Sequence, residues 1–193
     1  MKKKHLSANA SIINICQRLH QKAFVSAYGG NVSVRTGAKV VITPTRYSLA
    51  ELEEDDLVVV DLDGNVLFGI NAPSSELMMH LKIYQLRPDV CGIVHSHPPA
   101  ATSFAYVNKE IVPIIPEANA YLKKVPIVPF HPVGSEALSE AVAKDTKNYD
   151  VVMLEKHGLV SIGETLSEAY NLTELVEETA IMNMYVRNLM REQ

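Results

Sequence analysis

The centre of the sequence is a short apolar run, Val90-Cys91-Gly92-Ile93-Val94-His95-Ser96-His97-Pro98-Pro99. Its β-branched residues predict a buried strand, and alternate side chains of a strand share one face. His95 and His97 therefore project the same way, about 6.6 Å apart along the chain, so both imidazoles can converge on one metal ion. The prolines end strand pairing and set the two histidines at the end of the strand. Because the chain has seven histidines, the pair alone is weak support for a metal site.

Length and composition narrow the class of protein. The 193 residues, 47% of them hydrophobic, suffice for a sizeable core, and we expect a single domain spanning residues 1–193. A net charge of −4 gives the chain as a whole no excess of basic residues, so no nucleic-acid partner is expected. Polar and small residues follow Lys2-Lys3-Lys4, and no apolar run reaches the length of a membrane span, so we expect neither a signal peptide nor a membrane partner. Cys16 and Cys91 form no disulfide framework, and buried, inert thiols in a cytoplasmic protein are expected.

Hydrophobic periodicity divides the chain into short helices and strands. Helices are predicted over residues 7–23, 100–105, 134–144 and 165–191, and strands or hairpins over 32–42, 57–67, 125–130 and 151–162. A further helix is expected to begin at Ser74-Ser75, with a serine as N-cap, and to stop before Pro88. Its buried face would comprise Leu77, Met78, Leu81 and Tyr84. The stretch 111–117, interrupted by two prolines, is expected to be an edge strand or a loop.

Three polar stretches have the composition of an anion-binding cradle. Gly29-Gly30-Asn31 precedes a strand, and glycines let backbone N–H groups approach a phosphate closely, although the stretch is equally typical of a plain turn. Thr45 and Arg46 place a hydroxyl and a guanidinium at a strand end. Ser74 and Ser75 lie where a helix N-terminus could bind phosphate, or could simply cap the helix.

Two carboxylates and a third histidine complete the polar residues of interest. Glu76 falls in the first turn of the predicted helix, where a carboxylate also stabilises the helix dipole. His157 lies at a strand–turn junction beside Gly158. His95, His97 and His157 with one carboxylate make a zinc-type set that leaves one position open to substrate. Glu117 stands alone among apolar neighbours, either as a solvated loop acid or as an acid held in an apolar site.

Five motifs occur in one order along the chain: Gly29-Gly30-Asn31-Val32-Ser33-Val34, Ile42-Thr43-Pro44-Thr45, Pro73-Ser74-Ser75-Glu76, Arg87-Pro88-Asp89 with Val94-His95-Ser96-His97, and Leu154-Glu155-Lys156-His157-Gly158-Leu159-Val160. This series resembles the class II aldolase/adducin head family from about residue 8 to residue 189. The resemblance implies a three-layer α/β/α domain around a central, mainly antiparallel sheet. It also implies a cyclic homotetramer with active sites at the subunit interfaces.

The resemblance further implies a metal-dependent carbon–carbon lyase of sugar phosphate metabolism. A divalent metal, most often Zn²⁺, would bind His95, His97 and His157. Glu76 would be the fourth ligand in the empty site and the proton-transfer base once substrate displaces it. The substrate phosphate would bind residues of the cradle: Gly30, Asn31, Thr45, Ser74 and Ser75. Cleavage of the C3–C4 bond of a ketose phosphate, of the fuculose 1-phosphate kind, would pass through a metal-stabilised enediolate to a triose phosphate and an aldehyde.

The chain departs from the family pattern at three places. Arg46 stands where the aldolase phosphate loop usually has glycine, and it would either bind the phosphate or narrow the pocket. The chain ends at Gln193, so the tail that carries a catalytic tyrosine from the neighbouring subunit is expected to be missing. The tyrosine of the middle loop is also unmatched. Pro116-Glu117 occupies that region, and Glu117 resembles in position an acid of methylthioribulose-1-phosphate dehydratases, which makes it a second candidate catalytic residue.

Two alternatives to an aldolase follow from the same resemblance. A dehydratase or a 4-epimerase would use the same enediolate chemistry, but the epimerase signature carries Asp where Glu76 stands. A non-catalytic, adducin-like interaction module would lack the metal histidines, and this chain keeps all three. An aldolase is therefore the favoured prediction.

Overall fold

A computed structural model describes residues 7–191, so Lys2-Lys3-Lys4 lies outside the described residues. The strands are β1 (Asn31–Thr36), β2 (Lys39–Ile42), β3 (Val58–Asp61), β4 (Val66–Phe68), β5 (Gly92–Ser96), β6 (Ile127–Val128), β7 (Val151–Leu154) and β8 (Gly158–Gly163). The helices are α1 (Ala8–Gln21), α2 (Leu77–Leu86), α3 (Pro99–Tyr106), α4 (Pro116–Tyr121), α5 (Glu136–Asp145) and α6 (Leu166–Arg191), with a 3₁₀ turn at Glu54–Asp56.

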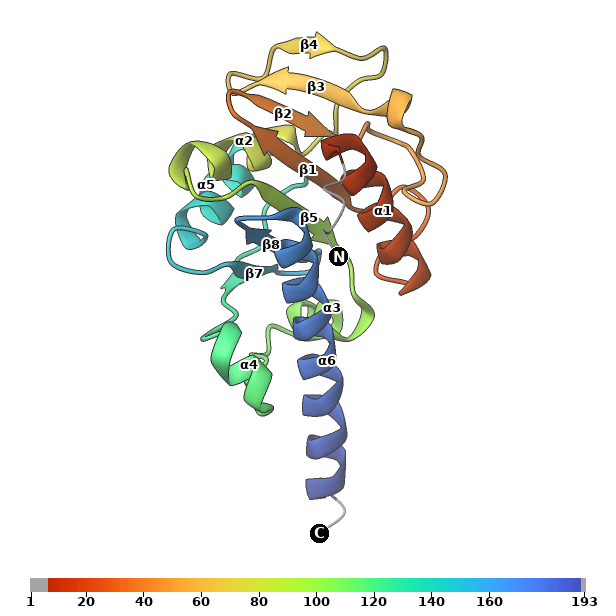
Figure 1. Ribbon diagram of the computed structural model, residues 1–193. Helices are drawn as coiled ribbons and strands as arrows, with labels where there is room; N and C mark the ends of the chain where they lie inside the picture. Colours follow the sequence, from red (N-terminus) through yellow and green to blue (C-terminus); the bar gives the residue numbers. More distant parts are fainter. Residues whose placement is uncertain (1–6, 192–193) are drawn as a thin grey trace, which may run out of the picture.

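Within residues 7–191 the strands form one eight-stranded sheet in the order β4-β3-β2-β1-β5-β8-β7-β6. Figure 1 labels the strands of this order from β4 to β7. Each neighbouring pair is antiparallel except β6 and β7, which are parallel. The predicted central, mainly antiparallel sheet is therefore confirmed. The apolar run around residue 93 forms β5, an inner strand between β1 and β8.

Helices cover both faces of the sheet, which confirms the predicted three-layer arrangement (Figure 1). Helices α2 and α5 pack on one face and share an apolar cluster with Ile93. Helices α1 and α6 cover the other face and share a cluster with Val94. Because successive strand residues face opposite ways, His95 lies on the same face as Ile93, beneath α2.

The first helix forms for the reasons that its sequence predicts. The Ser7 hydroxyl accepts a hydrogen bond from the Ala10 backbone N–H at 3.1 Å, as an N-cap does. The apolar stripe is fully in the core: Ile12, Ile15, Cys16 and Leu19 are buried. The helices predicted over 100–105, 134–144 and 165–191 are likewise present as α3, α5 and α6.

Three local predictions were wrong. Helix α2 begins at Leu77, not at Ser74-Ser75, and its N-cap position is Glu76 without a capping side-chain bond. The Ser74 hydroxyl instead accepts the Glu76 backbone N–H at 3.2 Å, which makes a turn ahead of the helix. Met78 is 47% exposed, because it lies on the solvent side of the helix, whereas Met79 is buried. Glu117 lies in the first turn of the short helix α4, not in an edge strand or a loop.

No helix among the described residues is both long and apolar enough to span a bilayer.

Candidate metal and catalytic site

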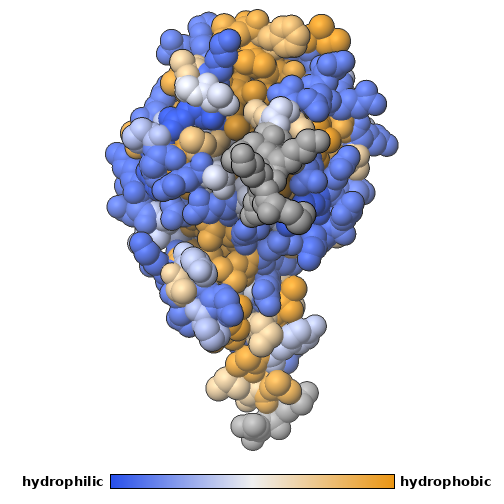
Figure 2. All heavy atoms as spheres, viewed as in Figure 1, coloured by the Kyte–Doolittle hydropathy of each residue, from blue (hydrophilic) through white to orange (hydrophobic). Residues whose placement is uncertain are grey.

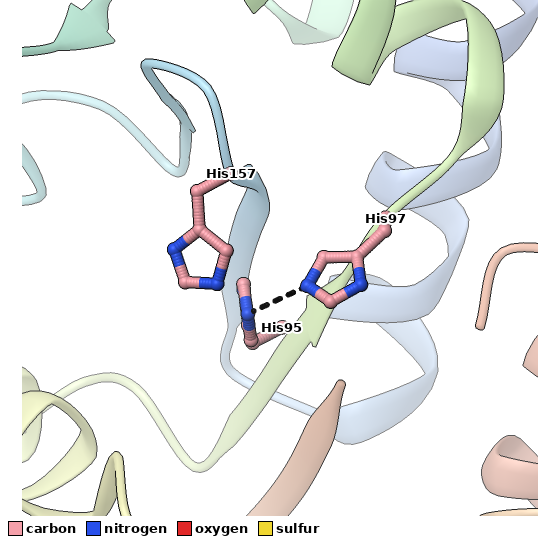
Figure 3. Close-up of side chains that lie close together, drawn as sticks. All are labelled: His95, His97 and His157. Carbon is pink, nitrogen blue, oxygen red and sulfur yellow. Dashed lines mark hydrogen bonds between the residues drawn. The ribbon is translucent and has the colours of Figure 1, made fainter. Parts of the chain in front are cut away.

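Three histidines from two parts of the sheet meet at one point (Figure 3). His95 is the fourth residue of β5, His97 follows that strand, and His157 lies in the turn that joins β7 to β8. Pairing of β5 with β8 places His95 opposite Val160, which brings the turn alongside. One ring nitrogen from each histidine lies within 4.8 Å of the others. The sequence prediction that these three residues would converge is matched by this geometry.

The tautomer of His95 suits metal binding. Its Nδ1 lies 3.0 Å from the Leu159 carbonyl oxygen, which can only accept, so Nδ1 carries the proton. The unprotonated Nε2 therefore faces the cluster, 3.2 Å from Nε2 of His97. A backbone carbonyl that fixes the second ring nitrogen is the usual support for a metal-ligating histidine.

The Glu76 carboxylate closes the cluster. It is buried, and its Oε2 lies 3.2 Å from Nε2 of His95 while its Oε1 lies 4.0 Å from Nε2 of His157. Glu76 Oε1 and His157 Nδ1 are buried atoms without a hydrogen-bond partner within residues 7–191. An unpaired buried carboxylate oxygen is costly unless a cation or a ligand satisfies it.

Burial keeps the three histidines neutral. It is the main cause that lowers the pKa of His95 well below its ordinary range, and the neighbouring His97 lowers it further. The pKa of His97 is lowered by burial and that of His157 falls to about 4, although Glu76 opposes both shifts. Neutral imidazoles and one carboxylate are the donor set of a divalent transition-metal site, so the residues fit such an ion.

Two glycines make room for the His97 ring. A Cβ added to Gly29 would lie 2.8 Å from His97 Nδ1, and one added to Gly158 would lie 2.5 Å from His97 Cδ2. Any side chain at either position would push the imidazole out of place. The sequence placed Gly29 in a turn, either a plain one or an anion-binding one. No local signal marks a glycine that makes room for the ring of a residue distant in sequence.

The segments of the predicted anion cradle lie side by side. The Thr45 backbone N–H donates to the Ala72 carbonyl and the Ser74 N–H donates to the Thr43 carbonyl, both at 3.1 Å. The Thr43 hydroxyl in turn accepts from the Val32 N–H, which ties both segments to β1 next to Asn31. The segments that carry Thr45 and Ser74 therefore run side by side next to β1, and Ser74 is hydrogen-bonded to Glu76.

The Asn31 side chain has contacts that the sequence did not predict. Its Nδ2 donates to Glu76 Oε2 at 2.9 Å, and its Oδ1 lies 2.6 Å from Nε2 of the buried His80. Further in, the Ser33 hydroxyl joins His80 Nδ1 at 2.7 Å and the Tyr84 hydroxyl at 2.8 Å. Polar residues at positions 31 and 33, alternating with valines, are the signal that would have found this network.

Two predicted site residues are not tied to the cluster. Arg46 is exposed and its backbone has a φ of 62°, the left-handed region that glycine favours. Glu117 is exposed on α4. Within residues 7–191 no hydrogen bond or ion pair joins either side chain to Glu76 or to the three histidines. Glu117 is thus a solvated acid in this chain, not an acid enclosed in an apolar site.

Known proteins resemble the chain over nearly its whole length. Residues 10–184 match the family described as Class II Aldolase and Adducin N-terminal domain. An L-fuculose phosphate aldolase of Methanococcus maripaludis is 41% identical over 179 residues, which cover 93% of this chain and 97% of that protein. A 3-oxo-tetronate 4-phosphate decarboxylase of Haemophilus influenzae is 30% identical over 181 residues, which cover 91% of this chain and 86% of that protein.

A solved structure agrees with these sequence matches. The L-fuculose-1-phosphate aldolase of Thermus thermophilus superposes with a TM-score of 0.88 at 29% identity, covering 96% of this chain and 97% of that one. Fold, motif order and sequence similarity thus point the same way. The chain therefore belongs to the class II aldolase and adducin N-terminal domain family, among its aldolase members.

Proposed function

We propose that this aldolase cleaves a ketose 1-phosphate of the fuculose 1-phosphate type to a triose phosphate and an aldehyde. The observation that carries the proposal is the buried Glu76 carboxylate, which has one unpaired oxygen beside three neutral histidines. The names of the relatives support the substrate class.

His95, His97 and His157 would hold the metal ion, with Glu76 as a fourth ligand before substrate binds. A set of three imidazoles and one carboxylate favours zinc among divalent ions. Such an ion would supply a Lewis acid for the ketone oxygen of the substrate.

Glu76 carries the proton transfer. When the C3–C4 bond breaks, the Glu76 carboxylate would take the proton of the C4 hydroxyl and C4 would become the aldehyde carbon, while the electron pair of the broken bond stays on C3 as an enediolate. A carboxylic acid at Glu76 then gives a proton to C3, which completes the triose phosphate. Burial of Glu76 keeps bulk water away from this carbon.

The phosphate would bind across the cradle. Ser74 keeps its hydroxyl proton, because its oxygen only accepts from the Glu76 N–H. Asn31 keeps one amide proton, since only one is used toward Glu76. Gly30, Thr45 and Ser75 would add backbone and hydroxyl donors, and Arg46 would add charge from the rim.

We further propose a homotetramer with sites at the subunit interfaces, in the cytoplasm. The second half of α6 supports it, because this helix extends below the sheet (Figure 1) with apolar side chains on its surface (Figure 2), Leu189 and Met190 being 63% and 71% exposed. Glu117, exposed on α4, would then serve the site of a neighbouring subunit. Cys16 and Cys91 are free thiols, which suits a reducing compartment.

Decarboxylation is the second candidate function. The relative from Haemophilus influenzae is named as a decarboxylase of a 3-oxo acid phosphate. Loss of CO₂ beside a ketone leaves the same enediolate on the retained fragment, so Glu76 could protonate that carbon equally well. The two functions differ in the leaving group, which the proposed phosphate cradle would not contact.

The test combines metal content with turnover. The purified protein should hold about one divalent metal per chain and should cleave L-fuculose 1-phosphate faster than it decarboxylates 3-oxo-tetronate 4-phosphate. The variant His95→Ala/His97→Ala should lose both the metal and the activity. Full metal occupancy in that variant would exclude the proposed site, and faster decarboxylation would select the second function.

A further inference from the structure

A buried chain of hydrogen bonds leads away from Glu76 into the core. It passes from Glu76 to Asn31, then to His80, Ser33 and Tyr84. Relative exposures along it run from 5% at Asn31 to 0% at His80 and Ser33 and 1% at Tyr84. Beyond Asn31, the hydrogen bonds of this network, between His80, Ser33 and Tyr84, are not needed to bind a metal ion or a phosphate.

The direction of each bond follows from the carboxylate. A carboxylate only accepts, so the Asn31 amide must turn its NH₂ toward Glu76 and its Oδ1 toward His80. His80 Nε2 must then donate to Oδ1, which leaves Nδ1 of a neutral ring as an acceptor. Ser33 donates to Nδ1 and accepts from Tyr84. Each donor therefore points toward Glu76.

The neutral state of His80 agrees with these directions. Burial lowers the pKa of His80 to about 4, and the nearby Glu76 carboxylate only partly opposes this. At neutral pH the ring keeps one donor and one acceptor, as the chain requires.

This network of hydrogen bonds cannot conduct protons to solvent. Asn31, the member next to Glu76, is an amide, which does not exchange protons readily, and the far end of the network is the buried Tyr84 hydroxyl, 3.5 Å from the Cys91 carbonyl oxygen. Its effect on the site is therefore geometric. It fixes the rotamer of Asn31, and Asn31 in turn holds the Glu76 oxygen that lies next to His95.

We infer that His80 is a positioning residue, which acts through Asn31 to hold the Glu76 carboxylate at the three-histidine cluster. The expected effect of His80 on catalysis rests on the proposed function. Its expected effect on metal affinity depends only on how the Glu76 carboxylate is held next to the histidines. Helix α2 places both residues on its inner side, because Glu76 and His80 are four residues apart.

The experiment compares substitutions that keep or remove the Nε2 donor. In His80→Gln the side-chain amide can take the place of Nε2–H, whereas in His80→Asn the shorter amide matches Nδ1 instead. His80→Leu removes both contacts. Leu81→Ala is the control for general destabilisation, because Leu81 is buried on the same helix within an apolar cluster.

Two quantities are measured for each variant and for the wild type. The first is the Zn²⁺ affinity of the metal-free protein, from competition with a chelating dye. The second is the rate at which the C3 proton of dihydroxyacetone phosphate exchanges in deuterated water. His80→Leu and His80→Asn should weaken zinc affinity and lower the kcat of exchange by about 10- to 100-fold, with little change in KM. His80→Gln should recover most of both, and Leu81→Ala should match the wild type in both.

Equal zinc affinity in His80→Gln and His80→Asn would overturn the inference, even if His80→Leu did not fold. So would a loss in Leu81→Ala as large as that in His80→Leu. A wild-type protein that binds zinc but exchanges no C3 proton would contradict the proposed function alone, and the zinc affinities would still decide the role of His80.

Discussion

Arg46 is a non-glycine residue in a backbone conformation that glycine favours. Its φ is 62°, in the left-handed region, and its side chain is exposed. A non-glycine residue in this region costs about 1–2 kcal/mol. The protein therefore keeps a strained backbone at Arg46 although the exposed side chain adds little to packing. Such strain is expected where a side chain serves substrate binding.

Replacing Arg46 separates the effect of the backbone from that of the side chain. Arg46→Gly should raise the free energy of unfolding by about 1 kcal/mol, since glycine adopts this φ without strain, whereas Arg46→Ala should not. Both variants should raise the KM for a phosphorylated ketose by about tenfold, because each removes a charge-assisted hydrogen bond. Steady-state kinetics on a phosphorylated ketose and its unphosphorylated counterpart, with urea denaturation, provides the measurement. An equal change on both substrates would show that Arg46 shapes the pocket instead.

The sequence predicted part of what lies together in this cluster. His95 and His97 were expected side by side because strand residues alternate, and His157 and Glu76 were added by the resemblance in motif order. The contacts of Asn31 with Glu76 and His80 could not be predicted. The partners are separated in sequence by 45 and 49 residues, and they meet only because α2 packs on β1. Glu117 was predicted from a resemblance in the loop, and it lies outside the cluster of its own chain.

At the scale of elements, α6 and α3 are joined by one buried carboxylate. Glu177 of α6 accepts hydrogen bonds from the Ala100 and Ala101 backbone N–H groups, at 2.9 and 2.8 Å. These groups belong to the first turn of α3, which follows His97 almost directly. Burial raises the pKa of Glu177, and the two N–H groups oppose that shift. The contact thus anchors the segment that carries one of the three histidines.

Removing this contact should destabilise the protein. Glu177→Ala leaves the N–H groups of α3 without their acceptor, and we expect a loss of about 1.5–3 kcal/mol in the free energy of unfolding. The neighbouring Glu178 is exposed, so Glu178→Ala should change stability by less than about 0.5 kcal/mol. Urea denaturation of the two variants gives the comparison. Similar midpoints for both would mean that α3 does not depend on Glu177.

Element boundaries show what the sequence lacks. The hairpins and the long helix α6 were predicted correctly, because their turn residues and periodicity are local. The predicted start of α2 was too early in the sequence. The Ser74 hydroxyl accepts a hydrogen bond from the Glu76 N–H in a turn before the helix, and the Ser74 backbone N–H donates to the Thr43 carbonyl. Tertiary pairing of this kind overrides a local capping signal.

For the whole molecule, buried neutral histidines predict a loss of stability in mild acid. The folded-state pKa of His80, about 4, lies below its ordinary value of 6.5. Because this pKa is lowered, the His80 ring of the folded protein takes up its proton at a lower pH than the same ring in the unfolded protein. The stability that the neutral ring gives is therefore complete above about pH 6.5 and falls as the pH drops toward 4, by up to roughly 3 kcal/mol.

Chemical denaturation of metal-free protein between pH 7 and pH 4 measures this loss. His80→Gln has no titrating group at this position, so its stability should fall less steeply over the same interval than that of the wild type. Glu76, Asn31, Ser33 and Tyr84 surround the ring and are the same in both proteins. Parallel stability curves for the two proteins would show that His80 does not contribute to the acid sensitivity.

The pairing of β1 with β5 has one further consequence, for how this chain can change over evolution. Asn31 lies directly opposite His95, and Ser33 opposite Ile93. A deletion or insertion of one residue within either strand would turn every side chain beyond it to the opposite face. The histidine and the asparagine would then leave the site in the same event that moves valines out of the core. Length variation should therefore accumulate at remote turns such as Asp63-Gly64-Asn65, while the two strands can vary only by substitution.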